Sequence, residues 1–299
     1  MAKNVYNLHI WRKAQKVEAQ SNRDYSDVYN QIELELRQFY RRSSSYRLEN
    51  LNSVELQRFK NYIIKVRDIA NNINNVELKE RVTRLLRRVK ISREERLLLN
   101  IESKVAELTE IIIEDTDALL TKSIDDNFLS TVMLVKSTAE RIKKVSDIVL
   151  SKEIAKQIKE HTFPGAKFDD FIKQRHKNLF TTIERTVIKS LRTGTGIKAV
   201  SKDIRKMVKR QKGFNKLAIR NQMSHVLNLS AQEAMKKLDV EYYRFNAIVD
   251  SRTTVKCLGL NNTVHRVADG IPGVNMPPTS PPVHPCRSFI TPYYGENNG

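Results

Sequence analysis

The sequence predicts a mainly α-helical protein: a long helical N-terminal region, more helices, and a small, loop-rich α+β C-terminal module. Three observations carry this prediction. None of the nine glycines and eight prolines lies before residue 161, and these residues are the main interruptions of helices. Over the same stretch, apolar residues recur every three or four positions, which is the period of one helix face. Near residue 240 the pattern changes to aromatic and β-branched residues, which favour strands.

Residues 1–160 are expected to form an elongated helical region. Its apolar stripes run over Phe59–Val76, Val82–Val89, Ile101–Ile112 and Val132–Val145. We interpret these stripes as core rather than as ligand sites. Asn52–Glu55 and Ser92–Glu95 fit the capping box, in which side chains bond the free amides of the first helical turn. Helix breaks are expected near residues 42–45, 90–92 and 125–127.

Residues 161–238 are expected to hold a second set of helices. A stripe from Phe168 to Leu191 predicts one helix, and Thr193–Gly196 is expected to end it. A short helix over Ile197–Val208 and a separate helix near Asn215–Leu238 follow. The Gly-x-Gly at 194–196 lacks the preceding strand and the following Gly-Lys-Ser that a phosphate-binding loop needs, so we interpret it as a helix stop.

Residues 239–299 are expected to form the small α+β module that contains both cysteines. Val240–Val249 is rich in aromatic and β-branched residues and predicts a strand. Gly259–Val267 predicts a turn followed by a short strand. Seven of the eight prolines come after Ile271, which indicates that loops make up much of this module.

The net charge of +19 points to a polyanionic partner, most simply nucleic acid. Basic residues crowd the polar face of one predicted helix, and we take them as candidates for non-specific contact with double-stranded DNA: Lys202, Arg205, Lys206, Lys209, Arg210 and Lys212. Phosphate contacts of this kind are independent of base sequence and sensitive to salt. The alternative interpretation is a solvated helical surface with many lysines.

Composition also excludes several classes of protein. No run of about 18 apolar residues exists, so we expect neither a membrane-spanning helix nor a membrane partner. Met1–Tyr6 lacks the apolar stretch of a secretion signal. Two cysteines do not make a disulfide framework, and a reducing cytoplasm is the expected site of synthesis.

The C-terminal module contains four residues of the types that bind zinc: Cys257, His265, His284 and Cys286. Their spacing departs from structural zinc sites, which usually offer paired ligands two to four residues apart at both ends. A Cys257–Cys286 disulfide is a second alternative. We favour a third, in which both cysteines are small buried apolar residues and His284 bonds the backbone.

The same residues give little support for catalysis, so we expect no enzyme. Cys286 and His284 are two positions apart, and on an extended chain such residues point to opposite faces. Asp250 and Arg252 are more typical of a turn, and Arg252 and Arg287 of planar donors that tie loops together. The alternative function is a metal-dependent nucleic-acid-binding or nuclease-like protein.

The C-terminal motifs resemble those of the phage head morphogenesis (minor head protein) family, the group similar to protein F of phage Mu. The resemblance rests on Asp250–Cys257, Gly259–Val264 and Pro281–Arg287, with Leu191–Gly194 and Ala218–Arg220 in the same order upstream. It covers about residues 163–292. Two departures concern the metal ligands: Leu260 stands where relatives often have a second Cys, and one residue, Pro285, separates His284 from Cys286.

The resemblance implies a low-copy protein that assembles into the phage head. Its structural signature falls on Asp250, Arg252, Thr253, Cys257, His284, Cys286 and Arg287. The implied partners are the portal protein, the scaffold or major capsid protein, and the packaged DNA. The implied location is the inside of the virion head, after assembly in the bacterial host cytoplasm, with a role at the portal vertex and in genome packaging or ejection.

Overall fold

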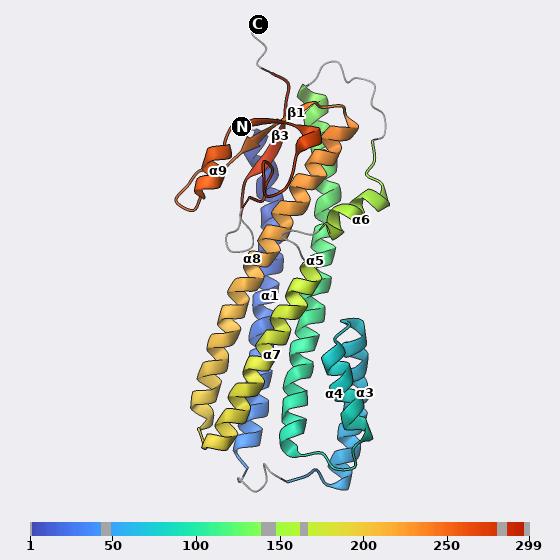
Figure 1. Cartoon of the computed structure of the whole chain (residues 1–299), viewed down its shortest axis with the longest axis vertical. Helices are drawn as coiled ribbons and strands as arrows, with labels where there is room; N and C mark the ends of the chain where they lie inside the picture. Colours follow the sequence, from blue (N-terminus) through green and yellow to red (C-terminus); the bar gives the residue numbers. More distant parts are fainter. Residues whose placement is uncertain (1, 43–48, 139–147, 162–166, 280–285, 296–299) are drawn as a thin grey trace. The chain divides into compact units, whose positions relative to one another are not determined.

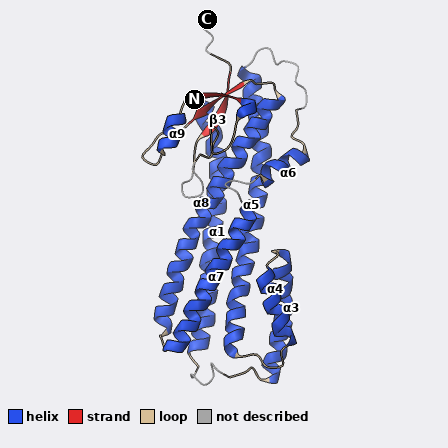
Figure 2. Ribbon diagram, in the orientation of Figure 1, coloured by secondary structure: helices blue, strands red, loops and turns tan. Residues whose placement is uncertain are grey.

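The computed structural model describes residues 2–42, 49–138, 148–161, 167–279 and 286–295, with side chains from residue 12 onward (Figure 1). The structure is 74% helical, with eight α-helices and three strands in the described part. Figure 2 shows that helices make up almost all of the regular structure and that strands occur only near the C-terminus. The predicted fold class is therefore confirmed.

The helices are α1 (Ala2–Tyr40), α3 (Ser53–Asn72), α4 (Val76–Arg87), α5 (Arg93–Thr138), α6 (Lys152–Glu160), α7 (Phe168–Thr193), α8 (Ile197–Lys237) and α9 (Val255–Leu260). The strands are β1 (Tyr242–Asn246), β2 (Val264–Arg266) and β3 (Phe289–Tyr293). Among the described helices, none is long and apolar enough to cross a bilayer.

Three predicted helix boundaries are confirmed by their local hydrogen bonds. Asn52 caps α3 and Ser92 caps α5, each through a reciprocal pair of bonds with the glutamate three residues later, Glu55 and Glu95. The α7 helix ends at Thr193, and Gly194 follows with φ = +70°, a conformation that L side chains rarely adopt.

The predicted break near residues 125–127 is wrong, because α5 runs unbroken from Arg93 to Thr138. Ile124 and Phe128 are fully buried there, and the Asn127 amide donates to the Leu227 carbonyl at 2.7 Å. The Asp-Asp-Asn run at 125–127 predicts a loop. Packing of the residues around it outweighs the weak helix propensity of these polar residues.

The division of residues 197–238 into two helices is also wrong, because α8 is continuous through Gly213. This glycine is exposed, and no neighbouring atom lies within 4 Å of the place where a Cβ would sit. Buried residues on either side, Gln211 and Asn215, continue the inward face of the helix across it. A single helical glycine costs about 1 kcal/mol relative to alanine, which this packing outweighs.

The stripe predicted from Phe59 to Val89 is divided by a turn that the sequence reading missed. Asn74 has φ = +51°, and Asn75 caps α4 by accepting the Leu78 amide at 3.0 Å. Asparagine tolerates the left-handed region and accepts hydrogen bonds at helix starts, so the Asn74-Asn75 pair was a readable signal.

Two compact units make up the structure. Unit 1 contains residues 1–18, 116–168 and 215–299, and unit 2 contains residues 19–115 and 169–214. Unit 2 includes an apolar cluster between α3, α4 and the first part of α5, centred on Ile63, Val66, Leu78, Val82 and Leu99. The division of the chain at residues 160 and 238 stays a prediction.

His176 on α7 lies at the centre of a buried polar group in unit 2. The Thr109 hydroxyl donates to the Val105 carbonyl at 2.7 Å, so it accepts from Nδ1 of His176, 2.8 Å away. Nε2 then carries no proton and accepts the Tyr25 hydroxyl at 2.5 Å. Burial lowers the pKa of His176 to about 3, which keeps the imidazole neutral.

Unit 1 packs the second half of α5 and α8 against the small sheet. Its largest cluster includes Phe128, Met223, Val226, Tyr243 and Ile290, all 5% exposed or less. The sheet is antiparallel, in the order β2-β1-β3. The predicted strand at 240–249 is present over Tyr242–Asn246.

The segment 259–267 forms the predicted short strand, β2, but its turn lies later than expected. Gly259 belongs to α9, and the turn falls at Asn261 and Asn262, where Asn262 has φ = +65°. Thr254 caps α9 by accepting the Cys257 amide at 3.3 Å. The sequence pattern predicts a turn at Gly259, and this helix was therefore missed.

Glu102 of unit 2 should make stability depend on pH. It is 6% exposed, Arg81 Nε lies 3.0 Å from its Oε2 atom, and burial raises its pKa to about 7. Between the unfolded value of 4.5 and pH 7 the folded state binds more protons, so the free energy of unfolding falls as pH rises. We expect Glu102→Gln to stabilise the protein by about 1–3 kcal/mol at pH 8.

The advantage of Glu102→Gln should disappear at pH 4, where both states of the wild type are largely protonated. Urea unfolding at pH 4, 6 and 8 measures the difference, with the exposed Glu80→Gln as control. Equal destabilisation at all three pH values would contradict this account of Glu102.

Candidate functional site

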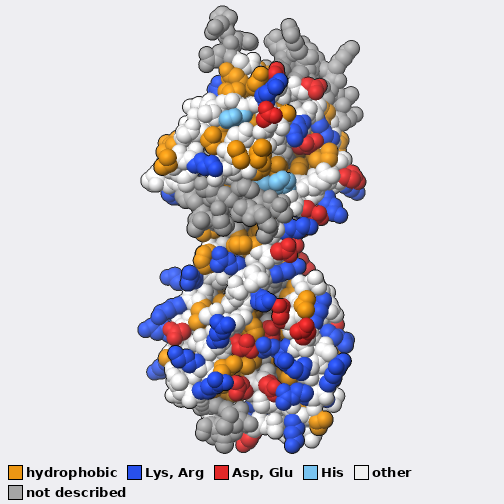
Figure 3. Space-filling model, viewed as in Figure 1, with side chains coloured by type: hydrophobic (Ala, Val, Ile, Leu, Met, Phe, Trp, Pro, Cys, Tyr) orange, Lys and Arg blue, Asp and Glu red, His pale blue; other side chains and the backbone are white. Residues whose placement is uncertain are grey.

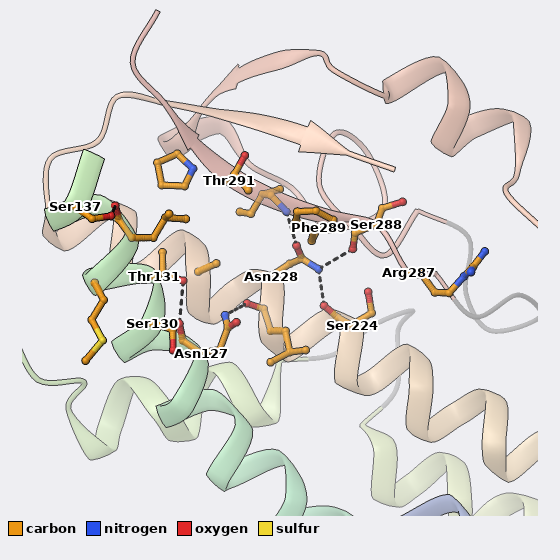
Figure 4. A pocket seen from close by; sticks show the side chains of 16 residues that line it. Asn127, Ser130, Thr131, Ser137, Ser224, Asn228, Arg287, Ser288, Phe289 and Thr291 are labelled. Carbon is orange, nitrogen blue, oxygen red and sulfur yellow. Dashed lines mark hydrogen bonds between the residues drawn. The ribbon is translucent and has the colours of Figure 1, made fainter. Parts of the chain in front are cut away.

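Residues 286–290 of the C-terminal module bond one face of α8 in unit 1. Asn228 of α8 is the central contact: its Oδ1 accepts the Ile290 amide at 3.0 Å, and its Nδ2 donates to the Ser288 carbonyl at 3.4 Å and to the Ser224 carbonyl at 2.7 Å. Figure 4 shows Asn228 between Ser224 and Ser288. One side chain therefore satisfies the backbone where β3 begins.

Two more amides of α8 bond the module in the same way. Asn221 Oδ1 accepts the Cys286 amide at 3.3 Å, and Gln232 Nε2 donates to the Val267 carbonyl at 2.8 Å. Asn221, Asn228 and Gln232 are spaced by seven and four residues, so they share one helix face. All three are buried, and this polar stripe is the element that sequence reasoning missed.

Asp250 organises the turn that carries the Asp-x-Arg-Thr motif. Its Oδ1 accepts the Arg252 amide at 2.8 Å, while its own amide donates to the Thr253 hydroxyl at 2.8 Å. The Thr253 hydroxyl in turn donates to the Ile248 carbonyl at 2.6 Å. Arg287 Nη2 lies 2.5 Å from Oδ1 of Asp250 and joins this turn to the start of the last strand segment. The interpretation of a turn tied by planar donors agrees with this geometry.

The charge of Asp250 is held by these donors. Arg287 first, and then the Arg252 amide, keep the pKa of the Asp250 carboxyl well below its usual range. The carboxylate is therefore ionised at any physiological pH and cannot act as a general base poised near neutrality. Its role in this geometry is to accept hydrogen bonds.

Cys257 and Cys286 lie side by side, 29 residues apart in sequence. Their sulfurs are 3.9 Å apart, both thiols are free, and the two residues are 4% and 2% exposed. Thr279 lies 2.9 Å from the Cys257 sulfur. The Cys286 thiol holds the pKa of Cys257 below its usual value, and the same contact raises the pKa of Cys286. The pair thus favours one thiolate at a time.

The candidate zinc ligands come together only in part. His265 bonds the Thr263 hydroxyl through Nε2 at 2.8 Å and packs against the Tyr243 ring. His284 lies outside the described residues, together with the Pro281–Pro285 part of the signature. Within the described residues, no group of three or more His, Cys, Asp or Glu is placed to hold a metal ion. The zinc alternative stays a prediction.

A cavity of about 440 Å³ lies in unit 1 next to the hydrogen bonds of Asn228 and Arg287 described above. It lies between α5, α8 and the segment 287–292, and its walls are mainly apolar (Figure 4). Its polar residues are largely engaged with backbone: Asn127 donates to Leu227, and Thr131 donates to the Asn127 carbonyl at 2.9 Å. The side chains that line the cavity include no reactive cluster. Asn228 and Arg287 form part of its wall.

Two histidines that are far apart in sequence also meet in unit 1. Nδ1 of His161 lies 3.0 Å from Nε2 of His225, which is fully buried. Burial first, and then the neighbouring His161, lower the pKa of His225 to about 3. The sequence offered no signal for this pair, because 63 residues separate its members.

The six basic residues predicted to contact DNA lie on the part of α8 that belongs to unit 2. Lys202 and Lys209 are exposed and make no ion pair with a described residue. Lys206 lies 3.6 Å from Asp203, and Arg205 lies 3.9 Å from Glu33 and over the Tyr29 ring. Lys and Arg side chains are frequent on the visible face in Figure 3, with Asp and Glu among them.

Comparison with known proteins finds a similarity in the C-terminal part of the chain. Residues 181–290 match the family model described as phage Mu protein F like protein. This match confirms the predicted resemblance in the C-terminal region. No curated protein matches the chain, and no solved structure does.

Asn228→Ala should destabilise the protein by about 2–3 kcal/mol, because it leaves the Ile290 amide and the Ser288 carbonyl buried without a partner. Urea unfolding followed by circular dichroism measures the change. The exposed Asn61→Ala on α3 is the matched control and should change stability by less than about 0.5 kcal/mol. If the two variants lost the same stability, the helix α8 amides would not hold the module.

Proposed function

We propose that this chain, whose residues 181–290 match the phage Mu protein F-like family, is a minor head protein that acts in head assembly at the portal vertex. The observation that carries this proposal is the signature itself. Arg252, Thr253 and Arg287 all bond Asp250, and Cys257 and Cys286 are buried. Such an arrangement supports a structural role rather than catalysis.

The proposed partners are the portal protein, the scaffold or major capsid protein, and double-stranded DNA contacted without sequence preference. The excess of basic residues supports the DNA contact, since net charge of +19 favours association with a polyanion. The protein would act in the host cytoplasm during assembly and then lie inside the head, where it could assist genome packaging or ejection.

Purified virions and their DNA-free precursors should both contain this polypeptide, and tagged protein should retain the portal protein on an affinity column. Mass spectrometry of gradient-purified particles measures the first, and immunoblotting of the eluate the second. An unrelated basic helical protein of similar charge serves as the column control. Absence from particles, or portal retention equal to that control, would contradict the proposal.

Duplex DNA should bind the purified protein with an affinity that falls steeply with salt and does not depend on sequence. Fluorescence anisotropy with two duplexes of unrelated sequence, at several NaCl concentrations between 50 and 200 mM, measures both properties (about 10-fold or greater loss is expected over this range). A salt-independent affinity, or no binding at 50 mM, would remove the DNA contact from the proposal.

The second candidate is a metal-dependent nucleic-acid-binding or nuclease-like protein, and the close approach of Cys257 and Cys286 is the observation in its favour. Two thiolates offer half of a tetrahedral zinc site. Elemental analysis with free-thiol titration separates the two candidates. Stoichiometric zinc together with DNA cleavage that EDTA and Cys286→Ala abolish would favour the second one.

A further inference from the structure

Two arginines in unit 2, one of them among the six basic residues described above, lie over the same aromatic ring. Arg175 of α7 lies over the Phe214 ring of α8, with its guanidinium carbon 4.1 Å from the ring centroid. Arg210 lies over the same ring at 5.5 Å, and Arg175 also contacts the Phe171 ring at 5.1 Å. Figure 1 shows that α7 and α8 run side by side here. The rings thus hold two guanidinium groups in defined positions.

Neither guanidinium has an acidic partner in the part of the chain that the structure describes. Among the described residues, Arg175 and Arg210 make no ion pair, whereas Arg205 and Lys206 on the same helix each have one. Two cations that share one aromatic ring repel each other unless an anion lies near both. The positive charge of the two guanidinium groups is therefore not balanced by a carboxylate among the described residues.

A small cavity lies between these groups. Its volume is about 170 Å³, and Arg175, Arg210 and Phe214 line it together with two carboxamides, Asn178 and Gln211. No Asp or Glu lines it. Asn178 accepts the Gln174 amide at 3.0 Å through Oδ1, so its own N–H groups remain as donors. Two guanidinium forks and a carboxamide donor match the acceptor oxygens of a phosphate.

We propose that Arg175, Arg210 and Asn178, positioned around Phe214, form a binding site for a phosphate group of the DNA backbone. This proposal rests on the proposed DNA contact and deepens it by naming the residues that fix the DNA to the protein. The exposed lysines of α8 attract DNA at longer range, while the two guanidinium groups bind one backbone phosphate directly. Arginine suits this role because its planar fork bonds phosphate oxygens in pairs.

The helix offers a charge-matched control for this site. Lys202 and Lys209 are seven residues apart and share one face of α8, whereas Met207, Arg210 and Phe214 lie roughly a third of a turn away on the face that lines the cavity. Lys202→Gln/Lys209→Gln therefore removes two positive charges, as Arg175→Gln/Arg210→Gln does, but changes no residue that lines the cavity.

Fluorescence anisotropy with a labelled duplex should separate the two variants. We expect Arg175→Gln/Arg210→Gln to weaken DNA binding by about 10-fold or more and Lys202→Gln/Lys209→Gln by about threefold or less, because only the first removes direct phosphate contacts. Arg210→Gln alone tests the site without risk to the fold, since this side chain is exposed. Arg175→Lys keeps the charge but loses the fork, and it should behave like the arginine variants. Equal losses in both double variants would overturn the proposal.

A second measurement distinguishes this site from the DNA contact as a whole. Inorganic phosphate should raise the melting temperature of the wild type relative to chloride at equal ionic strength, and this rise should be absent in Arg210→Gln. If phosphate stabilises the wild type but no duplex binds, the phosphate site is supported and the proposed DNA contact is contradicted. If duplexes bind all variants equally and phosphate has no effect, the phosphate site is contradicted while the proposed DNA contact is supported.

Discussion

The signature module depends on hydrogen bonds that one helix face offers to backbone groups without sheet partners. A three-stranded sheet with strands of three to five residues cannot satisfy its own edges or build a large core. Asn221, Asn228 and Gln232 of α8 supply acceptors and donors at the points where the chain enters β3 and leaves β2. Because a helix fixes the spacing of these amides, it also fixes the positions of Val267, Cys286 and Ile290, which bond them. The module is therefore ordered by α8 more than by its own strands.

Buried polar groups support the fold in some places and reduce its stability in others. The His176 group is fully matched, since each of its donors finds one acceptor, and so it adds specificity to unit 2. Glu102 is matched less well: Arg81 lies near it, but Arg81 also pairs with Glu184, and burial raises the pKa of Glu102. A buried ion pair of this kind costs desolvation that a shared partner offsets only in part. The bond between Arg220 and Glu18 in unit 1, with contacts of 2.5 and 3.0 Å, is a better geometry for a buried carboxylate.

Local rules predicted the elements well and the contacts between distant residues poorly. The absence of Gly and Pro, the capping boxes and the change of period near residue 240 were sufficient for the fold class, because each is a property of neighbouring residues. The breaks expected at 125–127 and before Asn215 failed because tertiary packing overrides weak local signals. Asp250 and Arg287, or Asn228 and Ile290, lie 37 and 62 residues apart, and no spacing rule joins them. The signature was visible in the sequence, but the α8 amides that bond the chain around Cys286 were not.

The chemistry of the signature residues follows from what surrounds them. A nucleophilic cysteine needs an accessible thiolate and a base within reach, and Cys257 and Cys286 instead face each other in a buried space. A carboxylate that acts as a base needs a pKa near neutrality, and the donors from Arg287 and Arg252 move that of Asp250 the other way. Among the described residues, Asp250 is thus engaged with Arg252 and Arg287, and the Cys286 amide is bonded to Asn221.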